Sequence, residues 1–202
     1  MISERQARKL WPEQHKRRHE QERSFLDALR KADGSRLLEA MDYMEWTPRF
    51  LRSLAKLPKV SNESRALVLS IWIRSGDHWR SEVNDDLLLL DVLRNLLPPY
   101  KRDAVRLFRG ESAFNRRHRT YGFAWTSDRI VAESFAKNNA ERCSGGTALL
   151  ETFAPRDAII CVPQDHNKEF HAGEAEYIVD RRRLDEVRVI KRCPEAEVRS
   201  ST

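Results

Sequence analysis

Two glutamates two positions apart are the residues of this sequence that most directly suggest chemistry. Glu174 and Glu176 lie in the stretch GEAEYIVD, residues 173–180, which is predicted to be a strand preceded by turn residues. In a strand, side chains at positions i and i+2 point to the same face and lie about 7 Å apart. The pair therefore indicates either two carboxylates held over a substrate, or a half-buried strand whose solvent face carries two charges.

Two earlier segments carry further polar residues at the ends of predicted strands. The segment LFRG ends a strand with Arg109 and Gly110, and FAWTSDRIVAESFA is a short strand that reaches Thr126 and Ser127 before it turns into a helix. Alone, such an arginine is commonly a surface ion, and such a Thr-Ser-Asp run is commonly a helix N-cap. The combination of all three segments, in this order within residues 100–202, is more specific than any one of them.

Together the three segments resemble the active-site segments of ADP-ribosyltransferases, in the class marked by an arginine, a Ser-Thr-Ser strand and a Glu-x-Glu strand. The resemblance covers residues 104–192, and WTSDRIVAESFA and EAEYIVD carry most of it. Enzymes of this superfamily cleave NAD between nicotinamide and ribose and transfer the ADP-ribose to an acceptor. The resemblance implies a split β-sandwich and NAD as co-substrate, and the sequence has no metal-ligand cluster, so no metal is expected.

The resemblance also implies roles for the residues that would bind NAD. Arg109 corresponds to the arginine that holds the NAD phosphates, and Gly110 lies where backbone groups bind the nicotinamide amide. Thr126 and Ser127 correspond to the floor of the cleft. Phe135 corresponds to a ring against nicotinamide, although its position on the apolar stripe of a predicted helix also fits packing in the core.

Glu176, the second glutamate, corresponds to the catalytic residue, and Glu174 to the residue that positions or deprotonates the acceptor. Residues 163–173 correspond to the acceptor-recognition loop. Cleavage of the NAD glycosidic bond builds positive charge on the ribose, as glycoside hydrolysis does, so a fixed carboxylate stabilises the transition state. An arginine suits a diphosphate because its planar fork donates two parallel hydrogen bonds.

The sequence departs from the family pattern at one position. Trp125 stands where the first serine of Ser-Thr-Ser would hydrogen-bond the catalytic glutamate. The resemblance then requires Ser127, Thr126 or Tyr121 to orient Glu176, or a cleft that is built differently.

Composition sets broad limits on the remaining possibilities. The 202 residues are 40% hydrophobic and 34% charged, with a formal net charge of +6 that is spread evenly over the two halves. This basic excess permits a nucleic-acid or acidic partner without requiring one. The basic runs 115–119 and 181–183 could contact NAD phosphates or a nucleic acid, or be solvated faces. Three scattered cysteines indicate a reducing compartment, and the absence of a signal peptide or apolar span predicts a cytoplasmic protein or one delivered by a signal-free route.

Periodicity predicts two regions that divide at Pro98 and Pro99. Residues 1–99 are predicted to be helical, with helices beginning near Ser3, Pro12, Ser35, Thr47, Ser61 and Asn84; a helix over 61–76 ends at Gly76. After residue 100, six short apolar or alternating runs predict strands over 104–110, 123–127, 146–153, 157–163, 174–180 and 187–192. One helix over 127–138 interrupts them, and its apolar stripe consists of Ile130, Val131, Ser134 and Phe135.

These observations predict an α+β protein: a helical region over 1–99 that recognises a target or an antitoxin-like partner, and a catalytic domain over 100–202. The expected activity is mono-ADP-ribosyl transfer from NAD to a protein arginine or to RNA or DNA, with no role for a membrane. A toxin, a phage-encoded host modifier and a phage-defence effector all fit. One alternative is an enzyme that destroys NAD by transfer of ADP-ribose to water or phosphate. Another is a non-enzymatic nucleic-acid-binding module on the same scaffold.

Overall fold

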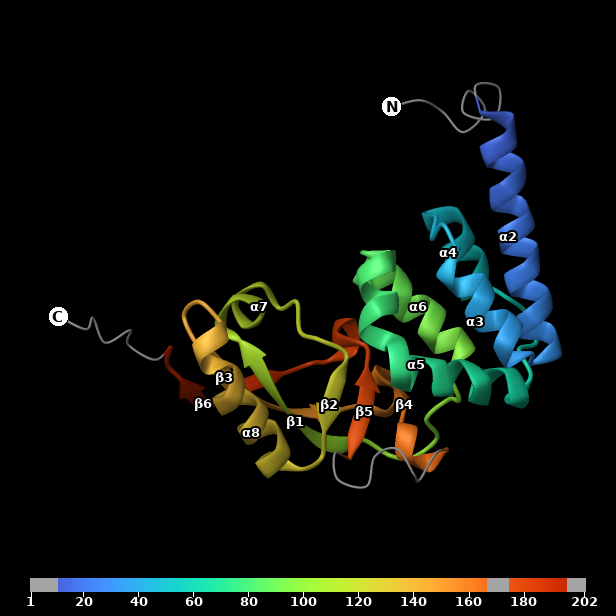
Figure 1. Ribbon diagram of the computed structural model, residues 1–202. Helices are drawn as coiled ribbons and strands as arrows, with labels where there is room; N and C mark the ends of the chain where they lie inside the picture. Colours follow the sequence, from blue (N-terminus) through green and yellow to red (C-terminus); the bar gives the residue numbers. More distant parts are fainter. Residues whose placement is uncertain (1–10, 167–174, 196–202) are drawn as a thin grey trace. The chain divides into compact units, whose positions relative to one another are not determined.

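The computed structural model describes residues 11–166 and 175–195. The chain forms two compact units, Met1–Pro98 and Pro99–Thr202. The prediction of an α+β protein is confirmed, because the described part of the first unit is helical and the second unit carries a six-stranded antiparallel sheet (Figure 1). Within the described ranges, no helix is both long enough and apolar enough to cross a lipid bilayer.

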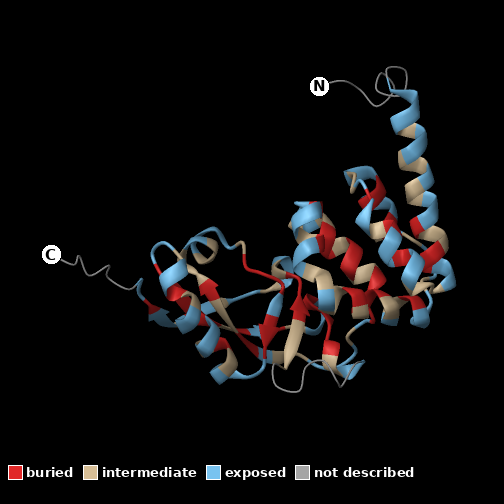
Figure 2. Ribbon diagram, viewed as in Figure 1, coloured by how far each residue is buried: buried red, intermediate tan, exposed pale blue. Residues whose placement is uncertain are grey.

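The first unit is built from helices around an aromatic core. Phe25 packs edge-on against Trp46 and Phe50, and Trp46 packs against Trp79. Figure 2 shows the buried residues on the faces that the helices turn toward one another within this unit. The helices are α2 (Pro12–Lys31), α3 (Gly34–Asp42), α4 (Pro48–Ala55), α5 (Asn62–Val83) and α6 (Asp86–Leu96).

One expected helix end in the first unit was wrong, two helix starts are shifted by one or two residues, and the helix start predicted near Ser3 lies outside the described residues. Helix α5 does not end at Gly76 but continues to Val83 through a kink at Ser75. Burial of Trp79 and Val83 beyond the kink outweighs the cost of one glycine in a helix, which is about 1 kcal/mol relative to alanine. Helix α3 is capped by Asp33 rather than opened by Ser35, and α6 is capped by Asp85 rather than Asn84.

The second unit is one antiparallel sheet with its strands in the order β4-β5-β2-β1-β3-β6. Each of the six predicted strand segments overlaps one of these strands. The strands are β1 (Val105–Ser112), β2 (Ala124–Thr126), β3 (Thr147–Ala154), β4 (Ile159–Cys161), β5 (Glu176–Val179) and β6 (Val187–Cys193). Two helices accompany them: α7 (Ala113–His118), which was not expected, and α8 (Arg129–Asn139), which is capped by Asp128.

Helix α8 packs on the sheet through a different face from the predicted one. Its buried residues are Ala132 and Ala136, whereas Ile130 is 76% and Phe135 is 50% exposed. The reason is close approach, because a Cβ placed on Gly110 of β1 would lie 2.5 Å from the backbone nitrogen of Ala136. Only small side chains fit between backbones at that spacing, so the larger apolar residues of α8 are turned aside.

This close contact predicts the effect of adding one methyl group. Gly110→Ala should lower the free energy of unfolding by about 1–3 kcal/mol, because α8 must move away from β1 to make room. Chemical denaturation measures the change. Gly34→Ala is the matched control, since the added methyl there meets only the end of the Leu67 side chain. Equal stability of the Gly110→Ala variant and the wild type would contradict the packing of α8.

On the face of the sheet opposite α8, a cluster of buried residues forms the main core of the second unit. It includes Leu107, Trp125, Leu150 and Val179. Cys161 of β4 is fully buried. Burial, together with the nearby carboxylate of Asp165, raises the pKa of the Cys161 thiol to about 12.

The buried thiol predicts selective protection from alkylation. At pH 8 the native protein should leave Cys161 unmodified by iodoacetamide over hours, because only the thiolate reacts and almost none forms at this pH. Partly exposed Cys143 should be modified under the same conditions. Peptide mass spectrometry checks both sites, with urea-unfolded protein as the control in which both react. Rapid native labelling of Cys161 would show that β4 is not buried.

Candidate active site

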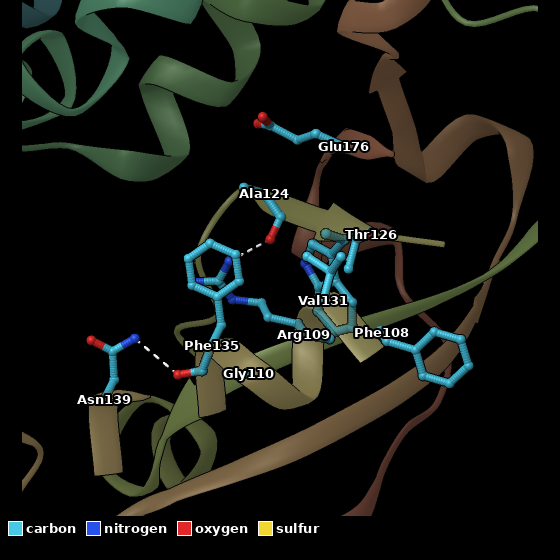
Figure 3. A pocket seen from close by; sticks show the side chains of 11 residues that line it. Phe108, Arg109, Gly110, Ala124, Thr126, Val131, Phe135, Asn139 and Glu176 are labelled. Atoms are coloured by element: carbon cyan, nitrogen blue, oxygen red, sulfur yellow. Dashed lines mark hydrogen bonds between the residues drawn. The ribbon is translucent and has the colours of Figure 1, made fainter. Parts of the chain in front are cut away.

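A pocket of about 240 Å³ lies between β1, β2, β5 and α8. Five residues that the sequence singled out line it together, although they come from four separate elements: Arg109, Gly110, Thr126, Phe135 and Glu176 (Figure 3). The remaining lining residues are Phe108, Ala124, Trp125, Val131, Ala132 and Asn139.

Strand pairing brings the two ends of the pocket together. Phe108 of β1 pairs with Thr126 of β2, and Thr126 pairs in turn with Glu176 of β5. This Phe108–Thr126 contact is the single registered pair between β1 and β2, whereas β1 and β3 are paired along their whole length. The sheet therefore opens between β1 and β2 on one side of this pair, and the Arg109 side chain lies at the opening.

Arg109 bridges the opening with its guanidinium group. Its Nε donates to Glu111 Oε2 over 2.7 Å, and its Nη1 donates to the carbonyl oxygen of Ala124 on β2 (Figure 3). A Cβ on Gly122 would lie 2.2 Å from Arg109 Nη2, so only glycine leaves room for this orientation. The side chain is 20% exposed, which leaves it accessible from the pocket while it is held by the protein.

Glu111 is a site residue that the sequence reasoning missed. It lies two positions after Arg109 on the same face of β1, and it is 5% exposed. Burial alone would raise the pKa of Glu111, but the charge and hydrogen bond of Arg109 and the donors of Gly122 and Asn115 outweigh it, so the pKa lies below its ordinary value. The available signal was the i, i+2 spacing of Arg109 and Glu111 in RGE, which places two opposite charges on one face of a strand.

Glu176 is the first residue of β5 and is partly buried. Ala175 before it has a φ of 41°, which is unusual for a residue with a side chain. The backbone around it is tied down, because Ser127 N donates to Ala175 O over 3.3 Å. With its amide oxygen turned toward β5, Gln164 also accepts hydrogen bonds from the backbone nitrogens of Ala175 and Glu176. A left-handed residue held in this way fixes the start of the strand that carries Glu176.

Several predicted site residues lie elsewhere. Tyr121 is buried in the core, where its ring meets Trp125 edge-on, so it does not face the pocket. Ser127 is exposed and is not among the lining residues. Glu174 lies outside the described residues, so the same-face spacing of the glutamate pair stays a prediction.

Trp125, which replaces the first serine of the expected motif, has a structural role. Its indole is 2% exposed and its Nε1 donates to Gly122 O over 3.2 Å. Of the three candidates to orient Glu176, Thr126 is the one that lies in the pocket and pairs with Glu176 across the sheet. Thr126 Oγ1 also accepts from the backbone nitrogen of Asp128, which fixes the turn into α8.

The two basic runs differ in their surroundings. Arg181 donates to Tyr121 O, Arg182 pairs with buried Asp180, and Arg183 pairs with Asp157, so the run 181–183 ties the chain to itself. At the end of α7, by contrast, Arg117 and the C-cap residue Arg119 are exposed beside His118.

No cluster of three or more His, Cys, Asp or Glu side chains that could hold a metal occurs among the described residues. Comparison of the chain with protein families, curated proteins and solved structures finds no match.

Proposed function

We propose that the second unit is an ADP-ribosyltransferase-like domain that cleaves NAD at the nicotinamide–ribose bond and transfers ADP-ribose to a macromolecular acceptor. The observation that carries the proposal is the shared pocket of Arg109 and Glu176, which lie far apart in the sequence and on strands separated by β2. The opening between β1 and β2 further supports the split sandwich that the sequence resemblance implies.

Arg109 and Phe135 suit the binding of a charged dinucleotide with an aromatic base. A guanidinium carries five N–H donors, of which the bonds to Glu111 and Ala124 use two, so Arg109 can still donate to a diphosphate oxygen. Phe135 lines the pocket with half of its surface exposed, so its ring is available to stack on nicotinamide.

Glu176 supplies the negative charge that the bond cleavage needs. As the glycosidic C–N bond breaks, its electron pair leaves with nicotinamide and positive charge grows on the ribose ring. A carboxylate held at the edge of the pocket stabilises this oxocarbenium-like state. The acceptor then forms a bond to the same ribose carbon and loses a proton to a base.

The volume of the pocket fits part of NAD. Sites for drug-sized ligands measure roughly 300–1,000 Å³. A cavity of about 240 Å³ is therefore suited to nicotinamide and its ribose, with the adenosine end lying on the open surface.

The test is incubation of the purified chain with NAD labelled in the adenine ring, together with total cell protein and RNA. We expect release of free nicotinamide, measured by chromatography, and label on protein or RNA. Free ADP-ribose without labelled macromolecule would identify an NAD glycohydrolase, and phosphate-dependent ADP-ribose phosphate would identify a phosphorylase. Failure to release nicotinamide under any of these conditions would overturn the enzymatic proposal.

A further inference from the structure

Within the part of the chain that the structure describes, the buried carboxylate of Glu111 accepts four hydrogen bonds. Oε2 accepts from Arg109 Nε and from Gly122 N, over 2.7 and 3.0 Å. Oε1 accepts from Ser112 N and from Asn115 Nδ2, over 2.9 and 3.0 Å. An ionised carboxylate has acceptor capacity for all four donors and presents no N–H or O–H of its own. The surroundings of Glu111 are therefore built for the charged form.

These donors come from three parts of the chain, of which Arg109 lines the pocket. Gly122 precedes β2, Asn115 lies on α7, and Arg109 lies two residues before Glu111 on β1. Asn115 extends the network, since its carbonyl oxygen accepts from Thr120 N and its Oδ1 accepts from Thr120 Oγ1. Glu111 thus joins both ends of the connection between β1 and β2.

The network fixes the plane of the Arg109 guanidinium. Nε is held by Glu111, Nη1 is held by Ala124 O, and Nη2 lies against the Cα of Gly122, where no side chain intervenes. A long side chain that is oriented before a ligand arrives loses less conformational freedom on binding. Orientation of this kind is worth most for a bidentate contact, because both N–H groups must be in place together.

We infer that Glu111 is a positioning residue, which holds Arg109 in the orientation that presents its remaining N–H groups to an anionic group of the ligand. The identity of that group as the diphosphate of NAD rests on the proposed function. Glu111 itself need not touch the ligand, because both of its oxygens are occupied by the protein.

Glutamine at position 111 is the sharpest test, because it keeps the shape of the side chain and turns one acceptor into a donor that faces other donors. We expect Glu111→Gln to weaken NAD binding, measured by calorimetry, by about 10- to 100-fold, by analogy with the loss that is typical when a residue that orients a metal-ligating side chain is replaced. Glu111→Asp keeps the charge and should recover part of the affinity. Arg109→Ala combined with Glu111→Gln should bind no more weakly than Arg109→Ala alone, because Glu111 acts through Arg109.

Glu151→Gln is the matched control. Glu151 is also a carboxylate on a neighbouring strand beside an arginine, Arg106, over 3.5 Å, but it does not line the pocket. Its replacement should leave NAD affinity unchanged. Unchanged affinity in the Glu111→Gln variant would overturn the inference.

A second measurement separates this inference from the proposed function. The Nε–H proton of Arg109, observed by nuclear magnetic resonance without ligand, should exchange slowly in the wild type and rapidly in Glu111→Gln. If the wild type does not bind NAD, the proposed function fails, and this signal alone decides whether Glu111 holds Arg109. Slow exchange that persists in Glu111→Gln would refute the positioning role. If Glu111→Gln does not fold, Glu111→Asp replaces it, and its shorter carboxylate should give exchange that is faster than in the wild type; an unchanged rate would then refute the positioning role.

Discussion

Replacement of Glu176 by glutamine is expected to slow the release of nicotinamide from NAD by about 100- to 1,000-fold, which corresponds to the roughly 3–4 kcal/mol that one preorganised electrostatic contact contributes to a transition state. The substitution keeps the size of the side chain and removes its charge. Since Glu176 opens β5 at the edge of the pocket, the core below it at Ile178 and Val179 should be unaffected.

The expected kinetic pattern identifies the role of Glu176. Because the carboxylate in the proposed reaction acts on charge that appears only as the bond breaks, kcat should fall by much more than the affinity for NAD. Single-turnover measurements of nicotinamide release give both quantities, and thermal unfolding shows whether the variant is folded. Glu151→Gln again serves as the matched control. A folded Glu176→Gln variant with wild-type kcat would exclude Glu176 from the chemistry.

Replacement of Arg109 by lysine is expected to affect both binding and stability. Lysine keeps the positive charge but has neither the Nε donor that meets Glu111 nor the planar fork that suits a diphosphate. We expect the KM for NAD to rise by about 10- to 100-fold, since one well-placed charged hydrogen bond to a ligand contributes roughly 1.5–3 kcal/mol.

The stability effect follows from the burial of Glu111. With the Nε donor removed, a nearly buried carboxylate loses a charged partner, which should lower the free energy of unfolding by about 1–3 kcal/mol. Urea denaturation measures this change. Arg106→Lys is the control, because the Arg106 side chain is 68% exposed and its contact with Glu151 is a surface ion pair. If Arg109→Lys were as stable as the wild type and bound NAD equally well, the arrangement around Glu111 would have no energetic importance.

The sequence predicted those features of the fold that depend on short-range patterns. Alternation of apolar and polar residues is a local property of strands, and it predicted strands over 104–110 and 174–180. The structure has β1 and β5 in these segments, and each of them pairs with β2. The helix starts near Thr47 and Ser61 were also predicted correctly, and the side chain of each accepts a hydrogen bond from a backbone nitrogen three residues later. Such contacts can be recognised without knowledge of the rest of the fold.

The features that were not predicted depend on contacts between distant residues. The buried face of α8 could not be derived from its apolar stripe, because it is set by the missing side chain at Gly110. The role of Glu111 was missed because an acidic residue in a short strand is usually solvated. Its burial becomes evident only when Gly122 and Asn115 are brought to it by the turn after β1.

Because β1 and β2 share a single registered pair, the stability of the sheet depends on the same side chains as the proposed site. Where the ladder stops, Arg109 reaches the carbonyl of Ala124 and Glu111 receives the amide of Gly122, so charged side chains replace backbone bonds as the seam of the sheet. Natural selection for cellular abundance alone would therefore preserve these residues. A relative without the proposed activity would be expected to keep Arg109, Glu111 and Gly122. Their presence in a diverged relative would therefore indicate the same fold rather than the same catalytic activity.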